Sequence, residues 1–516
     1  MLLLPLQVID RHVTPAGGEA SFTFSSIDDL IPAGARHLVL IFNAATIGAG
    51  DYGDLSLRPN ADATADKGHQ RIQGVGAGTA SAVSNGATSW LCSRILAGPN
   101  FADAYGGGVL LIPHAFNTTN HKVALLLAGA VEHAVNASAF HWPHTDAITS
   151  LFIYGSTDFI AGSIFTLAII DEQYNISEEI LDGADGSFTV DNIRQGEGDL
   201  LTIGYLRSDQ AAVEDEVLHT INDDAVAANY PAQELTGRAA VAAAASPVNQ
   251  EIGMVSGVNA LANDFGALVA TYPQFGRGYQ PHFLSISGYY ESTGPTSEIR
   301  AMSGRRDFVE PINKLHYEPN AGTDFKDGSG LWMYRVPKRL IDRQVLTADQ
   351  ARITFANIPQ YYEALIIHIW ARSTTGEVDD TCAIEINNDA GPVTYDSQRL
   401  AASGAAVVAL RSASSPNIST VPGSTDPARS FGGGTLFIPQ YNRTDGHKHI
   451  VVFDGDAEDI LQFYSFRWEN TDAITQIELY LTDVGAQEFV AGSVFELEGV
   501  LRKEGLPADA GMIIGV

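Results

Sequence analysis

Hydrophobic and polar residues alternate at every second position in many short runs of this chain. In the segment TSLFIY, Thr149, Leu151 and Ile153 share one face, while the other face tolerates varied residues. A period of two places successive side chains on opposite faces of a strand, so this pattern predicts half-buried β-strands. Other runs, such as HLVLIF and VLLIP, are apolar throughout. Because long patterns typical of amphipathic helices are absent, we predict an all-β protein.

The same phrases recur three times along the chain. In each copy an aromatic residue followed by glycine precedes a proline eight residues later: Tyr105 and Pro113, Phe265 and Pro273, Phe431 and Pro439. A second phrase ends each copy with a phenylalanine and a Gly-Ser pair: Phe159, Gly162 and Ser163; Phe325, Gly328 and Ser329; Phe489, Gly492 and Ser493. Blocks that recur in a fixed order at near-constant spacing indicate tandem copies of one unit.

The chain length agrees with three copies, since 516 residues correspond to about three domains of average size. Each copy offers many short strand-like runs separated by Gly, Pro, Asn and Asp, which is typical of sandwiches and jelly rolls. We therefore predict three tandem antiparallel β-sandwich, jelly-roll-like domains related by an internal repeat. Their predicted ranges are 1–171 with an N-terminal apolar arm, 172–340 with the most divergent sequence, and 341–516 with a short C-terminal tail.

Four segments lie outside this pattern. The stretches 172–186 and 339–350 are polar and acidic, and we expect them to be linkers with some helix. The alanine-rich stretch 234–246 is expected to be a loop or a short helix. The N-terminal arm is expected to form a strand, either in its own domain or added to a neighbour or partner.

The repeated residues suit a structural role. A glycine at the Gly-Ser turn permits positive φ or a close approach of two backbones. The serine hydroxyl can bond to the turn backbone, and the phenylalanine can close the end of a sandwich. We interpret these positions, together with the three prolines, as scaffold.

Asn/Asp turns recur in the three copies and are the weak candidates for an ion site. Side-chain oxygens at Asn222, Asp224, Asn387 and Asp389 could hold Ca²⁺. The alternative is an Asx turn that ends a strand. The spacing does not match a calcium-binding loop, so the turn is favoured.

Composition narrows the function further. The chain has 61 acidic against 30 basic residues and a formal net charge of −31, which argues against nucleic-acid binding. No run of about 20 apolar residues occurs, so membrane insertion is not expected. Five histidines crowd part of the first copy: His114, His121, His133, His141 and His144. They lack repeated counterparts, apart from an echo of His121 near His447, and are interpreted as scattered. No known catalytic motif occurs, and we assign no catalytic residue, metal or cofactor.

The repeated phrases resemble β-rich repeats of tailed-bacteriophage virion proteins. The third copy carries the pattern best, through residues of the Asn/Asp turn, the Trp-x-Asn-Thr-Asp block and the Gly-Ser turn: Asn387, Asp389, Tyr395, Trp468, Asn470, Gly492 and Ser493. The middle copy departs from it by losing the tryptophan and the Asn-Thr block. The resemblance implies a non-enzymatic structural protein of the virion, assembled in the bacterial host cytoplasm, as a capsid decoration, head-fibre or tail-associated protein. It implies major capsid or tail proteins as partners, and a homo-oligomer, with a trimer as the expected form.

Two other hypotheses stay open. The domains could bind a host-surface glycan through the divergent segments 74–88, 236–262 and 401–428. Alternatively the chain could be a polysaccharide hydrolase, since its acid content allows carboxylate pairs. No such pair recurs in matching places of the three copies, which disfavours the hydrolase.

Overall fold

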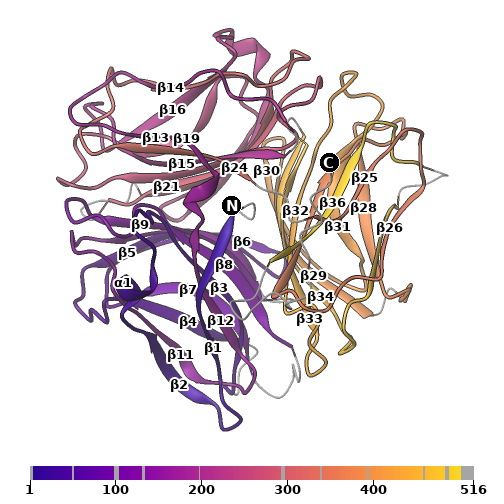
Figure 1. The fold of residues 1–516 in the computed structure, drawn as a ribbon, viewed down its shortest axis with the longest axis horizontal. Coiled ribbons are helices and arrows are strands. Elements are labelled where there is room, and N and C mark those ends of the chain that lie inside the picture. The colour runs from indigo at the N-terminus through magenta and orange to yellow at the C-terminus, as the bar shows by residue number, and fades with distance from the viewer. Residues whose placement is uncertain are drawn as a thin grey trace.

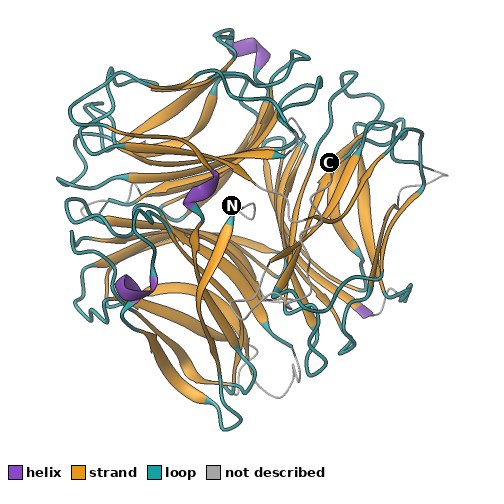
Figure 2. Ribbon diagram, in the orientation of Figure 1, coloured by secondary structure: helices purple, strands orange, loops and turns teal. Residues whose placement is uncertain are grey.

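The computed structural model describes residues 4–48, 52–97, 104–130, 134–196, 198–291, 297–336, 340–391, 394–456, 459–482 and 487–500. Within these ranges the protein is built from antiparallel β-sheets (Figure 2). The helices there are single short turns, α1 (Ile27–Leu30), η2 (Glu172–Tyr174) and η3 (Ala227–Asn229), and none is long enough to cross a membrane.

The strands fall into three units of twelve. The first unit contains β1 (Leu6–Val13), β2 (Glu19–Phe24), β3 (Leu38–Thr46), β4 (Tyr52–Pro59), β5 (Lys67–Val75), β6 (Gly78–Ala87), β7 (Trp90–Ala97), β8 (Gly106–Ile112), β9 (Lys122–Ala130), β10 (Ala134–Trp142), β11 (Leu151–Phe159) and β12 (Ile164–Ile170).

The second unit contains β13 (Asn175–Ile180), β14 (Phe188–Val190), β15 (Asp199–Leu206), β16 (Glu214–Ile221), β17 (Ala232–Arg238), β18 (Val241–Ala245), β19 (Glu251–Ser256), β20 (Gly266–Tyr272), β21 (His282–Tyr289), β22 (Glu298–Arg305), β23 (Leu315–Pro319) and β24 (Gly330–Val336).

The third unit contains β25 (Leu340–Val345), β26 (Arg352–Ala356), β27 (Ala364–Trp370), β28 (Asp379–Ile386), β29 (Tyr395–Ser403), β30 (Ala406–Ala413), β31 (Asn417–Pro422), β32 (Gly433–Pro439), β33 (Lys448–Gly455), β34 (Ile460–Trp468), β35 (Gln476–Leu481) and β36 (Val494–Val500).

All three units pair their strands in the same order. The third unit has an eight-stranded sheet, β25-β36-β27-β32-β33-β34-β29-β30, and a four-stranded sheet, β26-β35-β28-β31. Subtracting twelve from each label gives the two sheets of the second unit, and subtracting twelve again gives the pairings of the first. In the first unit β3 also pairs with β7 and β11, which joins its two sets into one twelve-stranded sheet. Each pair of sheets resembles a β-sandwich.

Each unit has its own core between its two sets of strands, and a fourth core is shared by all three units. In β3, Leu38, Leu40 and Phe42 point into the core of the first unit, while Val39 and Ile41 point into the shared core. The same alternation holds in β15 and β27. The eight-stranded sheets are therefore buried on both faces, which explains why their central strands are apolar throughout. Figure 1 shows the three units arranged around this centre.

Two sequence-based interpretations of local structure were wrong, those of the linkers and of the alanine-rich stretch. The predicted linkers contain β13 and β25, which pair with the last strand of their own units, β24 and β36. The alanine-rich stretch forms most of the β17–β18 hairpin, not a helix or loop, because Ala242 and Ala244 alternate inward and pack against the shared core. The N-terminal arm forms β1, which pairs with β12 of its own unit, so the first of its two expected arrangements is the one present. The C-terminal tail from residue 501 onwards lies outside the described residues.

Candidate functional site at the junctions between the units

The Gly-Ser turns lie where each unit begins its last strand. Gly162, Gly328 and Gly492 have φ values of 79°, 80° and 98°. Each neighbouring serine hydroxyl accepts a hydrogen bond of 3.1–3.2 Å from a backbone N–H near the end of β3, β15 or β27. Ser163 accepts from Ala45, Ser329 from Arg207 and Ser493 from Arg372. Phe159, Phe325 and Phe489 are fully buried beside these turns. The structure thus gives the repeated phrase the same backbone role in all three units.

The Asn/Asp turns hold the recurrent Thr-Asp-Ala-Ile-Thr segment in place. The Asn387 side chain accepts hydrogen bonds from the backbone N–H groups of Thr475 and Gln476 and donates one to Ala473. Asn60 and Asn222 make the equivalent bonds in their units. These side-chain oxygens are therefore engaged in turns that fix the backbone.

The aspartate of each turn accepts a hydrogen bond from the residue at the end of a neighbouring strand. The donors are Trp142 to Asp62 at 2.8 Å, Arg306 to Asp224 at 2.9 Å and Trp468 to Asp389 at 2.9 Å. The middle unit thus replaces an indole N–H by a guanidinium N–H and keeps the bond. This arrangement favours a structural interpretation of Asn222, Asp224, Asn387 and Asp389 over an ion site.

The loops that follow the repeated prolines reach into the next unit. The residue after each proline adopts a left-handed conformation: His114 at φ 51°, Gln274 at 50° and Gln440 at 53°. His114 lies against Trp332 of the second unit, with ring centroids 5.1 Å apart. Gln274 donates to Glu496 of the third unit at 3.2 Å.

The third unit completes the cycle by contacting the first. Gln440 donates to the Glu363 carboxylate of its own unit. That carboxylate also accepts from Arg11 of the first unit at 2.8 Å and from Thr166 at 3.4 Å. The first unit contacts the second, the second contacts the third, and the third contacts the first, so the three junctions close a ring.

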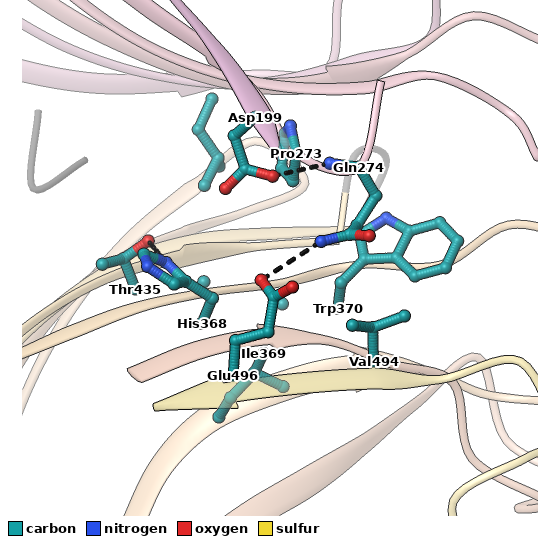
Figure 3. Close-up of a pocket in the computed structure, with 12 residues that line it drawn as sticks. Asp199, Pro273, Gln274, His368, Ile369, Trp370, Thr435, Val494 and Glu496 are labelled. Atoms are coloured by element: carbon teal, nitrogen blue, oxygen red, sulfur yellow. Dashed lines mark hydrogen bonds between the residues drawn. The ribbon is translucent and has the colours of Figure 1, made fainter. Parts of the chain in front are cut away.

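Figure 3 shows the junction between the second and third units. Gln274 lies between Asp199, which accepts its backbone N–H at 2.8 Å, and Glu496 across the junction. Asp199 and Glu496 are each 1% exposed. The free space between the lining residues is about 10 Å³, enough for a single water at most. A small-molecule site of ordinary size would need far more room.

Aromatic and glycine residues of the repeated phrases form the other side of each junction. Tyr279 of the second unit packs against Trp370 and Phe431 of the third, with ring centroids 4.8 and 4.9 Å apart. Arg443 of the third unit lies over the Tyr105 ring of the first, 3.9 Å from its centroid. The repeated motifs are therefore contact surfaces between units.

A second ring of contacts was not predicted from the sequence. Buried glutamines at one position of β5, β17 and β29 each donate to the turn of the next unit's hairpin. The bonds run from Gln70 to the Ala239 carbonyl at 3.1 Å, from Gln233 to Gly404 at 3.0 Å and from Gln398 to Gly76 at 2.9 Å. The turn residues all have positive φ, at 49°, 54° and 57°. The only signal in the sequence was a glutamine two residues before an apolar residue in each copy.

These hairpins account for much of the segments proposed to carry glycan specificity. Segments 74–88, 236–262 and 401–428 contain the strands β6, β18 and β30, together with β19 and β31. Strands β6, β18 and β30 contact one another. Their turn carbonyls are the acceptors of the glutamine ring, so these parts of the segments contribute to the junctions.

An acidic cluster in the second unit was also not predicted. Arg300 lies within 3.8 Å of four glutamates, Glu298 of its own strand and Glu216, Glu234 and Glu251 of other strands. Burial, followed by the charge of Glu216, raises the pKa of Glu251 to about 7. The guanidinium at its centre makes this a network of ion pairs rather than a pair of free carboxyls.

The histidines considered as candidate metal ligands from the sequence lie in different places in the structure. His121 and His141 of the first unit meet Asp264 of the second, whereas His144 lies beside Asp62 and Asp66. His114 belongs to the junction described above, and His133 lies outside the described residues. Cys92 and Cys382 are both buried and free, and burial raises the pKa of each thiol.

Comparison with known proteins adds little to this picture. No protein-family model and no curated protein sequence matches the chain. Among solved structures, it is similar to the Caenorhabditis elegans galectin LEC-6 at 10% identity, over 31% of this chain and 95% of that one, with a TM-score of 0.15. It is also similar to domains LG4-5 of the mouse laminin alpha1 chain at 11% identity, over 63% of this chain and 89% of that one, again with a TM-score of 0.15. Likenesses at this level carry no argument about function.

Proposed function

We propose that this chain is a non-enzymatic structural component of a tailed-bacteriophage virion, as a capsid decoration, head-fibre or tail-associated protein. In this proposal the three units are jelly-roll-like domains related by an internal repeat. The observation that carries it is the use of the repeated motifs: they bind the units to one another rather than forming a pocket. The resemblance of those motifs to virion repeats supports the same role.

The closed ring suits a protein that attaches as a rigid block. Since each unit uses its glutamine and its hairpin turn within the chain, those surfaces are already occupied. Attachment to a capsid or tail protein would therefore use other surfaces. A homotrimer would likewise need surfaces outside the junctions.

The edge strands β18 and β30 offer one such surface. They lie next to each other, and their outward side chains include Val241, Val408 and Leu410 at 62%, 39% and 49% exposure. Exposed apolar side chains on edge strands commonly mark a docking site. We propose this face as the contact with another virion protein.

Purified virions of the source phage provide the test. Mass spectrometry should detect the chain in the particles, and electron microscopy should place its density on the head or tail. Replacing Leu410 by Glu should reduce incorporation, whereas Val378→Glu, at an equally exposed valine outside this face, should not. Virions that lack the chain would contradict the proposal, and equal incorporation of both variants would contradict the docking face.

A further inference from the structure

Two histidines of the first unit and one aspartate of the second converge inside their junction. Asp264 Oδ1 lies 2.7 Å from His121 Nδ1 and 2.8 Å from His141 Nε2. All three potential ligand atoms lie within 4.8 Å of one another. His121 directly precedes β9, His141 lies in β10, and Asp264 lies just before β20.

The aspartate is only partly satisfied by these contacts. Asp264 is 0% exposed and His141 is 1% exposed. Asp264 Oδ2 has no hydrogen-bond partner among the residues that the structure describes. Leaving a buried carboxylate oxygen unpaired is costly, so the site favours a bound group that uses this oxygen.

Both units hold the ligands in position. The His121 backbone N–H donates to the Asn263 carbonyl at 3.1 Å, and the His121 carbonyl accepts from the Tyr205 hydroxyl. The His141 ring stacks on Tyr290 of the second unit, with centroids 5.2 Å apart and planes at 19°. The imidazoles are thus oriented before any ion binds, as a metal site requires.

We propose that His121, His141 and Asp264 bind one divalent transition-metal ion, with Zn²⁺ as the best match, and thereby clamp the first unit to the second. Two imidazole nitrogens and a carboxylate oxygen are ordinary Zn²⁺ ligands, and a water that also donates to Asp264 Oδ2 would complete the tetrahedron. The ion would replace the hydrogens that the two rings now share with Asp264 Oδ1. This inference rests on the junction alone and does not depend on the virion role.

The other two junctions lack this set. The strand register places Gln280, Arg305 and Ser430 at the equivalent positions of the next junction, and Ala104, His447 and Arg467 at those of the third. The predicted stoichiometry is therefore one ion per chain rather than three.

A second cluster provides the matched control. Asp62, Asp66 and His144 also converge, but Lys67 Nζ lies 2.7 Å from Asp62 Oδ2 and already supplies a cation. His144 is also more exposed than His141, with 35% of its side chain accessible. We expect this cluster to remain without a transition metal.

Calorimetric titration of the chelator-treated full chain with ZnCl₂ tests the proposal. We expect one equivalent to bind and the melting temperature to rise, since a ligand that binds only the folded state stabilises it. Asp264→Asn and His141→Gln should weaken binding about tenfold or more, while His144→Gln should bind as the wild type does. Absence of saturable binding, unchanged affinity in Asp264→Asn, or loss of binding in His144→Gln would each overturn the proposal.

Two further measurements cover the case in which a buried variant does not fold. His121→Gln changes the most exposed of the three ligands and should also weaken Zn²⁺ binding. Co²⁺ added to the wild-type chain should give the visible absorption of a four-coordinate ion with nitrogen and oxygen ligands. An unchanged Zn²⁺ affinity in His121→Gln, or an octahedral Co²⁺ spectrum, would contradict the site.

Discussion

Asp454 shows how a single buried carboxyl sets a pH dependence in the third unit. It lies in β33, is 0% exposed, and accepts hydrogen bonds from Ser419, Thr420 and Gln462. Burial nevertheless raises its pKa from 3.8 to about 6, because the charged form loses its hydration. The folded state therefore holds this proton more tightly than the unfolded chain does.

This pKa predicts a loss of stability with rising pH. The stabilisation is fully present below pH 3.8 and is lost as the pH rises through about 6. The change is worth about 3 kcal/mol at most. Urea unfolding at about pH 5 and about pH 8 should show a smaller difference in Asp454→Asn than in the wild type. The exposed Asp472→Asn should keep the wild-type difference, and equal differences in all three proteins would contradict the assignment.

Comparing Gly492 with Gly34 distinguishes the cost of backbone strain from the cost of a steric clash between units. Its φ is +98°, and a Cβ atom there would lie 2.7 Å from the Tyr279 hydroxyl of the second unit. Gly34 has a similar φ of +94° but open space around it. We expect Gly34→Ala to lose about 1 kcal/mol and Gly492→Ala about 2 kcal/mol or more of unfolding free energy. Equal losses in denaturant unfolding would show that the Tyr279 contact is unimportant.

At this scale the sequence predicted the backbone role of the Gly-Ser turns, but not the residues that contact them. Periodicity and repetition indicated a glycine with positive φ and a serine bonded to the backbone. They could not indicate that Gly492 faces Tyr279, because that contact joins residues more than two hundred positions apart. Repeated motifs reveal that positions matter, but not which copy each one touches.

At the scale of elements, the hairpins β5–β6, β17–β18 and β29–β30 link the units. Replacing Gln398 by Met removes the donor to Gly76 while keeping the side-chain volume. It should cost about 1–3 kcal/mol, because the half-buried Gly76 carbonyl loses its partner. Gln70→Met and Gln233→Met should cost similar amounts, and the exposed Gln7→Met less than about 0.5 kcal/mol. Thermal or urea unfolding measures these values, and a neutral Gln398→Met would argue against the ring.

The elements also show where pattern reading failed. An alanine-rich stretch has high helix propensity, yet β18 is a strand because its small side chains fit against the shared core. The polar segments expected to be linkers form the edge strands β13 and β25. Most of their side chains are exposed or half-buried, which explains why these strands carry charged residues. The apolar runs in β3 and β8 were the one sign that whole sheets are covered on both faces.

At the scale of the whole molecule, the shared core joins the three units into one folding unit. The eight-stranded sheets of the second and third units and the matching eight strands of the first unit all contribute residues to it. We therefore expect a single cooperative transition in calorimetry, with equal calorimetric and van't Hoff enthalpies. Three separate transitions would instead indicate independent domains.

The same core makes a prediction for an isolated unit. A fragment of residues 172–340 would expose the face that carries Leu201, Ile203 and Tyr205. It should aggregate at concentrations where the full chain keeps one defined mass, because a large apolar face would be open to water. Light scattering measures both masses, and a stable monomeric fragment would contradict the role of the shared core.

The ring of three junctions also has a genetic consequence. When a ring is built from three identical chains, any substitution appears in all three junctions at once. Here each junction is encoded separately, so a change in one leaves the others intact. Equivalent places in the three junctions hold the His114–Trp332 contact, the Gln274–Glu496 contact and the Glu363 carboxylate shared by Gln440 and Thr166, which shows how different three matching contacts can be within one chain.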